Sequence, residues 1–112
     1  MASTILNAVK TKYIETSQTT QYIPDGVKFS LDKCIVTNTG TQNAIMSISI
    51  ISENETPSAE NRLISNRLIR PDESYECPEI TGCILESRDY ISAISDIADT
   101  LVINISGREI NS

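Results

Sequence analysis

The sequence predicts an all-β protein, a single small antiparallel β-sandwich of jelly-roll-like form, with about eight strands and an extended N-terminal arm. Three observations support this fold class. Isoleucine occurs 18 times and threonine 11 times, and both are β-branched residues that favour strands. Apolar and polar residues alternate in several short runs, as they do in half-buried strands. Turn residues recur at intervals of roughly 8–12 positions, the spacing of sandwiches and barrels.

The 112 residues fit one domain. We expect residues 1–12 to form an N-terminal arm or a first strand, and residues 13–112 to form the β-sandwich. Ile5, Leu6 and Val9 would also suit one face of a helix, but the Thr, Tyr and Ile residues that follow disfavour its propagation. Residues 21–23 again resemble a strand.

The next part of the chain predicts two strands joined by a turn. Pro24-Asp25-Gly26 is a turn sequence, because Pro fixes φ and Gly permits a positive φ. A strand over 27–37 follows, with a β-bulge at Asp32-Lys33 where the alternation slips. Asn38-Thr39-Gly40 is a second turn, and it leads to a strand over 44–51. We expect these two strands to pair as a hairpin.

The remaining elements include the longest polar loop, residues 52–60. Further strands are expected over 61–69, 74–77, 81–85 and 90–93, with irregular structure over 94–99. In the final segment, 101–110, apolar Leu101, Ile103 and Ile105 alternate with other residues. A terminal segment this apolar frays unless it is paired, so we expect a central strand of the sheet.

The net charge of −6 and the pI near 4.5 disfavour nucleic acids and anionic membranes as partners, because the basic residues are few and scattered. No apolar run approaches the ~20 residues that span a bilayer. The N-terminal residues carry no secretion signal, so we expect synthesis and folding in a cytoplasm.

The chain contains no histidine, which excludes Ser-His-Asp and Cys-His catalysis and disfavours a zinc site. We therefore expect no enzyme activity, no cofactor and no metal. Cys34, Cys77 and Cys83 form no CxxC pair, and we expect three free thiols. A disulfide between Cys77 and Cys83 is the alternative, and Cys77 would be reactive if it were exposed beside Arg70 or Arg88.

Acidic residues give weak candidates for a catalytic or calcium site. Glu73, Glu76 and Glu79 recur every third position, but Pro78 interrupts their strand, so we do not expect them to share a pocket. Asp96 and Asp99 could offer oxygen ligands to calcium, yet their spacing matches no EF-hand loop. Two N-glycosylation patterns, at Asn54 and Asn104, are interpreted as chance.

Six segments together carry a family resemblance, although each is mainly turn chemistry and alternation. They are Tyr22 to Gly26; Val36-Thr37-Asn38-Thr39-Gly40; Ile69-Arg70-Pro71-Asp72-Glu73-Ser74-Tyr75; Leu85-Glu86; Asp89-Tyr90-Ile91-Ser92-Ala93; and Asn104 to Ile110. In this order they resemble a group of small β-sandwich virion structural proteins of tailed bacteriophages. The chain departs from the group at Arg88, where a glycine is usual before the aspartate.

The resemblance implies a non-enzymatic virion protein, either a capsid decoration (cement) protein that contacts the major capsid protein or a neck, collar or tail accessory protein. It implies a homo-oligomer, with a trimer as one form. We expect the N-terminal arm and the 52–60 loop to dock on neighbours, through Ala2, Ser3, Thr4, Ile5, Leu6, Val9, Lys10, Lys12, Asn54, Glu55 and Thr56. A carbohydrate-binding module is the alternative of another class, disfavoured because the chain has no Trp and four Tyr.

Overall fold

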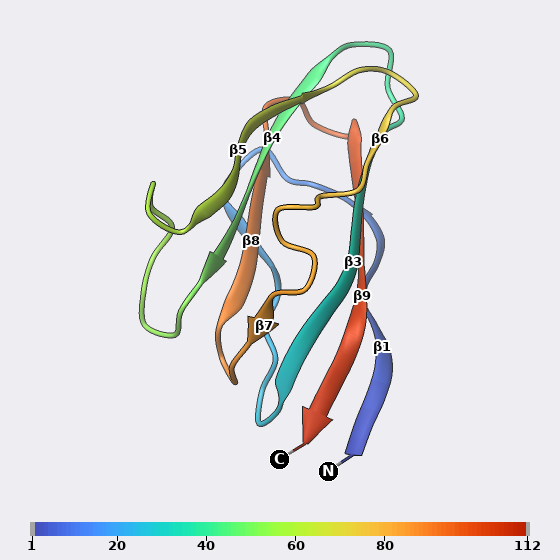
Figure 1. Cartoon of the computed structure of the whole chain (residues 1–112). Coiled ribbons are helices and arrows are strands. Elements are labelled where there is room, and N and C mark those ends of the chain that lie inside the picture. The colour runs from blue at the N-terminus through green and yellow to red at the C-terminus, as the bar shows by residue number, and fades with distance from the viewer. Residues whose placement is uncertain (1, 112) are drawn as a thin grey trace.

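The computed structural model describes residues 2–111, and their regular structure consists of strands in two antiparallel sheets packed face to face (Figure 1). The strands are β1 (Ala2–Tyr13), β2 (Thr19–Tyr22), β3 (Lys28–Asn38), β4 (Ala44–Ile51), β5 (Arg62–Ile69), β6 (Ser74–Tyr75), β7 (Ile84–Leu85), β8 (Tyr90–Ser95) and β9 (Leu101–Asn111). The first sheet has the order β1-β9-β3, with β6 and β7 both paired to β3. The second has the order β2-β8-β4-β5. The predicted β-sandwich is confirmed.

The final strand β9 lies between β1 and β3 and pairs with both along most of its length. Leu101, Ile103 and Ile105 point into the sandwich and are fully buried. Their alternation with half-buried Val102 and Asn104 is the period of two that the sequence shows. The prediction of a central closing strand is therefore confirmed.

The β-bulge predicted in β3 is also confirmed. The register of β3 against β9 shifts between Leu31 and Lys33, which leaves Asp32 as the extra residue. The Asp32 carboxylate accepts two hydrogen bonds from Arg108 on β9, at 3.0 and 3.2 Å. This bidentate pair holds the bulged residue against the neighbouring strand.

The expected hairpin between β3 and β4 is wrong, because the two strands belong to different sheets. Both sides of β3 are already occupied, by β9 on one side and by β6 and β7 on the other. Residues 39–43 therefore carry the chain across the end of the sandwich, and β4 pairs with β5 and β8 instead. Sequence alternation identifies a strand but not its partner.

Strand ends in the second half of the chain differ from the expected ones. The segments expected as strands over 74–77 and 81–85 shrink to the two-residue strands β6 and β7. Between them, Cys77 has a positive φ of 50° and Pro78 cannot donate a ladder hydrogen bond, so pairing stops. β8 continues to Ser95, two residues into the segment expected to be irregular.

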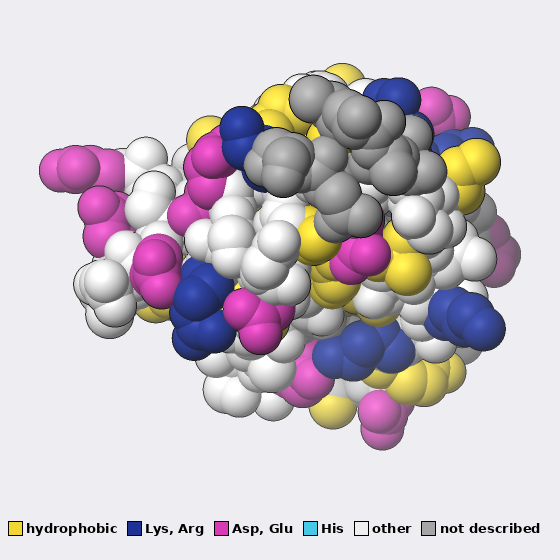
Figure 2. Space-filling model, turned by 90° about the horizontal axis from the view of Figure 1, so that it is seen from below, with side chains coloured by type: hydrophobic (Ala, Val, Ile, Leu, Met, Phe, Trp, Pro, Cys, Tyr) yellow, Lys and Arg dark blue, Asp and Glu magenta, His cyan; other side chains and the backbone are white. Residues whose placement is uncertain are grey.

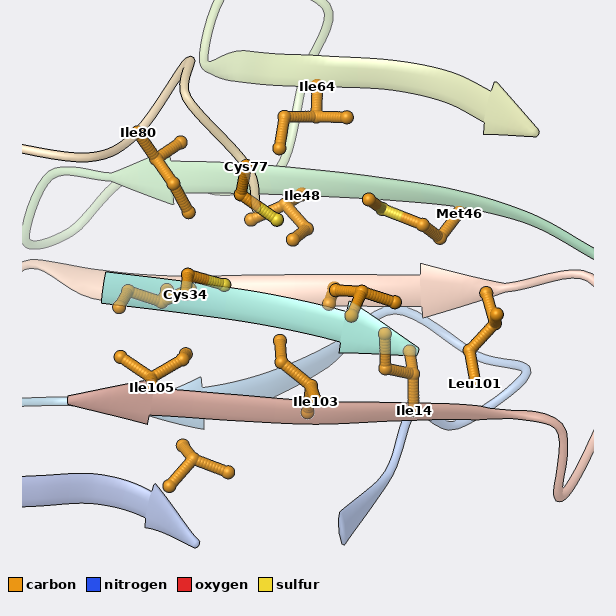
Figure 3. Close-up of a cluster of buried hydrophobic side chains, with 14 of the residues drawn as sticks. Ile14, Cys34, Met46, Ile48, Ile64, Cys77, Ile80, Leu101, Ile103 and Ile105 are labelled. Carbon is orange, nitrogen blue, oxygen red and sulfur yellow. The ribbon is translucent and has the colours of Figure 1, made fainter. Parts of the chain in front are cut away.

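The core between the sheets is almost entirely aliphatic (Figure 3). Its largest fully buried side chains include Ile14, Met46, Ile48, Ile64 and Ile80, and the thiols of two cysteines lie among them. Full burial of one such aliphatic side chain contributes about 1.5–3 kcal/mol. Every buried side-chain nitrogen or oxygen within residues 4–110 has a hydrogen-bond partner. The sandwich is thus well packed despite its single Phe.

Tyr22 on β2 connects the two sheets. Its ring packs on Phe29 of β3, with the ring centroids 4.8 Å apart, and its hydroxyl donates a 3.2 Å hydrogen bond to Glu109 on β9. Burial of the hydroxyl, followed by the charge of Glu109, raises the pKa of Tyr22 to about 12. The folded protein therefore keeps this proton at a pH where an unfolded chain loses it.

The raised pKa of Tyr22 predicts a specific loss of stability in alkali. The contribution is fully present below the ordinary tyrosine pKa near 10, and it is lost as the pH rises from there to about 12. We expect the free energy of unfolding, measured in urea between pH 9 and 11.5, to fall more steeply for the wild type than for Tyr22→Phe. Parallel pH profiles for the two proteins would contradict this prediction.

Candidate interaction surface

Among the described strands, β1 (12 residues) has the longest side without a partner strand. β1 pairs with β9 on its inner side, from Ala2 opposite Asn111 to Tyr13 opposite Val102, and no strand of the described chain pairs with its outer side. The register is regular over residues 2–7 and shifts twice between Asn7 and Lys12. We call this outer side, over residues 2–13, the β1 edge. A regular edge offers unpaired backbone donors and acceptors to another chain.

Within the β1 edge, residues 2–7 have no protection against such pairing. Natural edges are blocked by charged side chains, proline or bulges. Residues 2–7 contain no charge and no proline, while the register shifts and the two lysines all lie farther along. The part of β1 nearest the N-terminus is therefore the part best suited to accept a new strand.

Ile5 is the apolar side chain that stands out from this edge. It is 87% exposed, the largest exposed fraction among the large hydrophobic residues that the structure describes. Ile5 pairs with Arg108 on the outer face of β9. Arg108 pairs on its other side with Ser30 of β3, and Ser30 pairs with Ile84 of β7. Ile5 and Ile84 thus lie at the two ends of one row across the sheet, with Ile84 52% exposed.

Hydrophobic side chains lie in small groups between charged ones on the end of the molecule that holds the two chain termini (Figure 2). The described side chains on this end form no broad apolar face of the kind found in the core of an obligate interface. A contact on this end would therefore combine backbone pairing with a few apolar anchors such as Ile5.

The structure separates the other predicted contact residues of β1 by orientation. Val9 points inward and is buried, and Leu6 is half-buried against the core, so neither side chain is available to a partner. Thr4 and Lys10 are exposed. The structure does not describe the side chains of Ala2 and Ser3, which were also predicted as contact residues.

The two lysines of β1 differ in their surroundings. Lys12 forms a 2.6 Å ion pair with Glu15 and a 3.0 Å hydrogen bond to Gln21, whereas Lys10 has neither kind of contact in the described structure. Burial opposes ionisation of Glu15, but the hydrogen bonds from Lys12 and Gln21 outweigh it and hold its pKa below the ordinary value. Lys10 is therefore the charge of β1 that a partner would meet.

Acidic residues gather instead at the opposite side of the first sheet, in the segment that contains β6 and β7. They are Asp72, Glu73, Glu76, Glu79, Glu86 and Asp89. β1 itself contains no acidic residue. The acidic residues are thus unevenly distributed, and β1 itself adds no negative charge to a contact.

Several of these carboxylates, and that of Asp96, accept separate hydrogen bonds. Glu73 accepts a 2.9 Å hydrogen bond from the backbone nitrogen of Arg70, and Glu79 accepts one from the Tyr75 hydroxyl. Asp96, a calcium candidate, accepts a 2.8 Å hydrogen bond from the backbone nitrogen of Ile45. Within the described residues, no group of three His, Cys, Asp or Glu side chains is arranged to hold a metal ion.

The 52–60 loop lies at the other side of the sandwich, between β4 and β5, so the structure does not bring it together with β1 (Figure 1). The hydroxyl of Tyr90 donates a 2.6 Å hydrogen bond to the carbonyl of Glu55, and Asn61 bonds the carbonyl of Thr56 and the nitrogen of Ser58. Asn54, Glu55 and Thr56 are exposed. The loop is a second, separate surface with a tethered backbone.

Two shallow hollows flank the connection between β1 and β2. One, of about 350 Å³, is lined by Tyr13 to Ser17 with Ala98 and Asp99; the other, of about 230 Å³, lies over the outer face of the second sheet beside Ile45 and Ile94. Ligand pockets usually measure about 300–1,000 Å³ and enclose most of their ligand. One hollow is below this range and the other is near its lower end, and Tyr13, 47% exposed, is the one aromatic residue that lines them.

The residues that carry the family resemblance form contacts that hold the scaffold. The Asn38 side chain donates a 2.8 Å hydrogen bond to the carbonyl of Ile69, and its backbone exchanges hydrogen bonds with Asp72 and Glu73. Two resemblance segments, around Asn38 and over 69–75, therefore meet in space. Tyr22 and Glu109, from the first and last segments, meet as described above.

The chain matches no protein-family model, no curated protein and no solved structure. In the part of the chain that the structure describes, no helix has the length and hydropathy needed to cross a bilayer. The arguments for function are therefore the resemblance of the sequence segments and the geometry of the β1 edge.

Proposed function

We propose that this protein is a non-enzymatic virion structural protein of a tailed bacteriophage, a capsid decoration (cement) protein that stabilises the head through contacts with the major capsid protein. The observation that carries the proposal is the β1 edge, with an unpaired, uncharged and regular run over residues 2–7 and Ile5 87% exposed. The sequence resemblance supplies the class of partner.

The contact we propose is strand addition. An extended segment of the partner pairs with the outer side of β1, so that backbone hydrogen bonds provide affinity and pockets for alternate side chains provide specificity. Ile5 fills such a pocket, and Lys10 meets an acidic or neutral group. Each contact is small, but many copies on one lattice bind with much greater avidity than a single copy.

A neck, collar or tail accessory protein is the alternative within the same class, because strand addition would serve there equally well. In either location the protein is made in the cytoplasm of the host and acts in the virion as a homo-oligomer, with a trimer as one form. The 52–60 loop, on the other side of the sandwich, is a second contact surface available to a neighbouring copy.

Cryo-electron microscopy of the particle tests the proposal directly. We expect density for the sandwich at regular positions over the capsid lattice, with β1 closest to the major capsid protein. Density confined to the portal vertex or tail would replace the cement role by the accessory role. Absence from the particle would contradict the whole class.

Introduction of a charge at the apolar anchor Ile5 tests the surface itself. We expect Ile5→Lys to weaken co-sedimentation with capsids by at least about tenfold, because one charged side chain would have to be desolvated against an apolar pocket. Ile84→Lys is the matched control, since Ile84 is exposed on the same sheet but lies away from β1. Both changes are at exposed sites, so the midpoint of thermal unfolding should move little. Equal binding by both variants would refute the β1 edge as the docking surface.

A carbohydrate-binding module is the second candidate function, and the exposed ring of Tyr13 beside the larger hollow is the observation in its favour. Sugars stack on such rings, although one Tyr gives a small platform. Glycan-array binding that disappears in Tyr13→Ala, with capsid binding absent, would favour this candidate.

A further inference from the structure

Two buried cysteines lie close to the short pairing between β3 and β6: Cys34 is on β3, and Cys77 lies two residues beyond the end of β6. β3 pairs with β6 so that Val36 lies opposite Tyr75 and Thr37 opposite Ser74. Cys34 precedes Val36 by two residues and Cys77 follows Tyr75 by two residues, and beyond the end of this pairing the two thiols are in contact. Both are fully buried in the same core cluster, and their side chains lie together between the sheets (Figure 3).

We propose that Cys34 and Cys77 form a cross-strand disulfide when the folded protein meets a two-electron oxidant such as hydrogen peroxide. A disulfide requires two Cα atoms about 4.4–6.8 Å apart with side chains directed at each other, and two thiols in contact beside the β3–β6 pairing meet the second of these requirements. The bond therefore joins two side chains that already touch in the folded protein. This inference stands independently of the proposed function.

Cys83 is excluded as the partner by its place in the sheet, although it is nearer to Cys77 in sequence. Its carbonyl accepts a 2.9 Å hydrogen bond from the backbone nitrogen of Leu31, and the nitrogen of Gly82 donates to the carbonyl of Leu31. This contact holds Cys83 beside Leu31, on the other side of the bulge from Cys34, and its side chain is only half-buried.

The two thiols have different routes to an oxidant. Cys34 lies on an interior strand, and its contact with Cys77, together with burial, raises the pKa of its thiol, so that it stays protonated. Cys77 lies on the connection between β6 and β7, whose neighbouring residues Glu76 and Pro78 are exposed. Each of these strands holds β3 through only two residue pairs, so opening of the connection exposes Cys77 first.

The reaction balances in two steps. The Cys77 thiolate attacks one peroxide oxygen, and the released hydroxide takes up a proton to give water and a Cys77 sulfenic acid. The sulfur of Cys34 then attacks the Cys77 sulfur, and the leaving hydroxide departs as a second water with the thiol proton. Two thiols and one peroxide give one disulfide and two waters, so the sulfurs are oxidised and the peroxide is reduced.

The bond would fasten the acidic connection 76–83 to the interior strand β3. In the unfolded chain the disulfide would close a loop of about 40 residues and so lower its conformational entropy. We expect this to raise the melting temperature of the protein by on the order of 10 °C. Oxidation would thus attach residues 76–83, which are otherwise held by the two-residue strands β6 and β7, covalently to β3.

The test is oxidation of the folded full chain by hydrogen peroxide, followed by thiol counting under denaturing conditions and peptide mapping by mass spectrometry. We expect the three thiols to fall to one, with a cross-linked peptide pair containing Cys34 and Cys77 and a mass lower by two hydrogens. Cys83→Ser, the matched control, should form the same bond and show the same rise in melting temperature. Cys77→Ala should form none.

Peptide mapping of the wild type shows whether Cys34 and Cys77 are joined, even if Cys77→Ala does not fold. A bond from Cys77 to Cys83, sulfinic or sulfonic products in place of a bond, or three thiols still free after oxidation would each overturn the proposal. A Cys34–Cys77 bond found only in chains that were oxidised while denatured would also overturn it, because the folded geometry would then play no part.

Discussion

Gly107→Ala is expected to unfold the protein or to destabilise it by at least about 3 kcal/mol. Gly107 lies on the central strand β9, opposite Leu6 on one side and Leu31 on the other. A Cβ atom there would be 2.1 Å from the backbone oxygen of Ser30 and 2.7 Å from the ring of Phe29. The backbone oxygen belongs to an interior strand with partners on both sides, so it cannot move aside without breaking the ladder.

Ser106→Ala is the matched control for this effect. Ser106 is the preceding residue of β9 and points to the outer face, where its half-buried side chain has room. We expect it to change the free energy of unfolding, measured in urea, by less than about 0.5 kcal/mol. If Gly107→Ala unfolded at a urea concentration close to that of the control, the tight approach of β3 to β9 would be disproved.

The parts of the fold that the sequence could predict are the ones encoded by neighbouring residues. The alternation of Leu101, Ile103 and Ile105 predicts both a strand and its buried face, because burial on one side imposes a period of two. The slip at Asp32-Lys33 predicts the bulge, since an extra residue must interrupt that period. Each of these signals lies within a window of a few positions.

The features of the fold that the sequence could not predict depend on residues far apart in the chain. The 38–43 connection has the composition of a hairpin turn, but Asn38 bonds to Ile69, 31 residues later, and β3 obtains its partners from the C-terminal half. Local turn chemistry contains no information about which sheet the next strand joins. The error in pairing β3 with β4 therefore reflects a real absence of local signal.

The candidate surface was predicted in part. The sequence indicated residues of β1, but the direction of each side chain depends on the register shifts, which bury Val9 and leave Ile5 exposed. Tyr13, exposed at the end of β1, was missed because an isolated apolar residue in a polar context gives no strand face by itself. The exposed row from Ile5 to Ile84 exists only after β9 and β3 are placed between them.

Asn38→Ala is expected to cost about 3 kcal/mol of stability, measured by urea unfolding, because its fully buried side chain serves three backbone groups. It donates to the carbonyls of Gln42 and Ile69 and accepts from the nitrogen of Gly40, each at 2.8 Å. Alanine would leave these groups without partners inside the structure. Gln42→Ala is the matched control, because it keeps the carbonyl of the same turn and removes only an exposed side chain.

Asn38→Asp separates the hydrogen bonds from simple packing, because it keeps the shape of the side chain and removes its donor. The new carboxylate would face the two carbonyl oxygens, so its pKa would be raised in the folded state and its charge would be buried without a partner. A group with a raised folded pKa contributes stability below its unfolded pKa and loses it as the pH rises. The difference in unfolding free energy between wild type and Asn38→Asp should therefore narrow as the pH falls from 7 toward 4. If Asn38→Asp were as stable as the wild type across this pH range, Asn38 would act through its volume alone. The link between residues 38–43 and the end of β5 would then depend on the backbone hydrogen bonds.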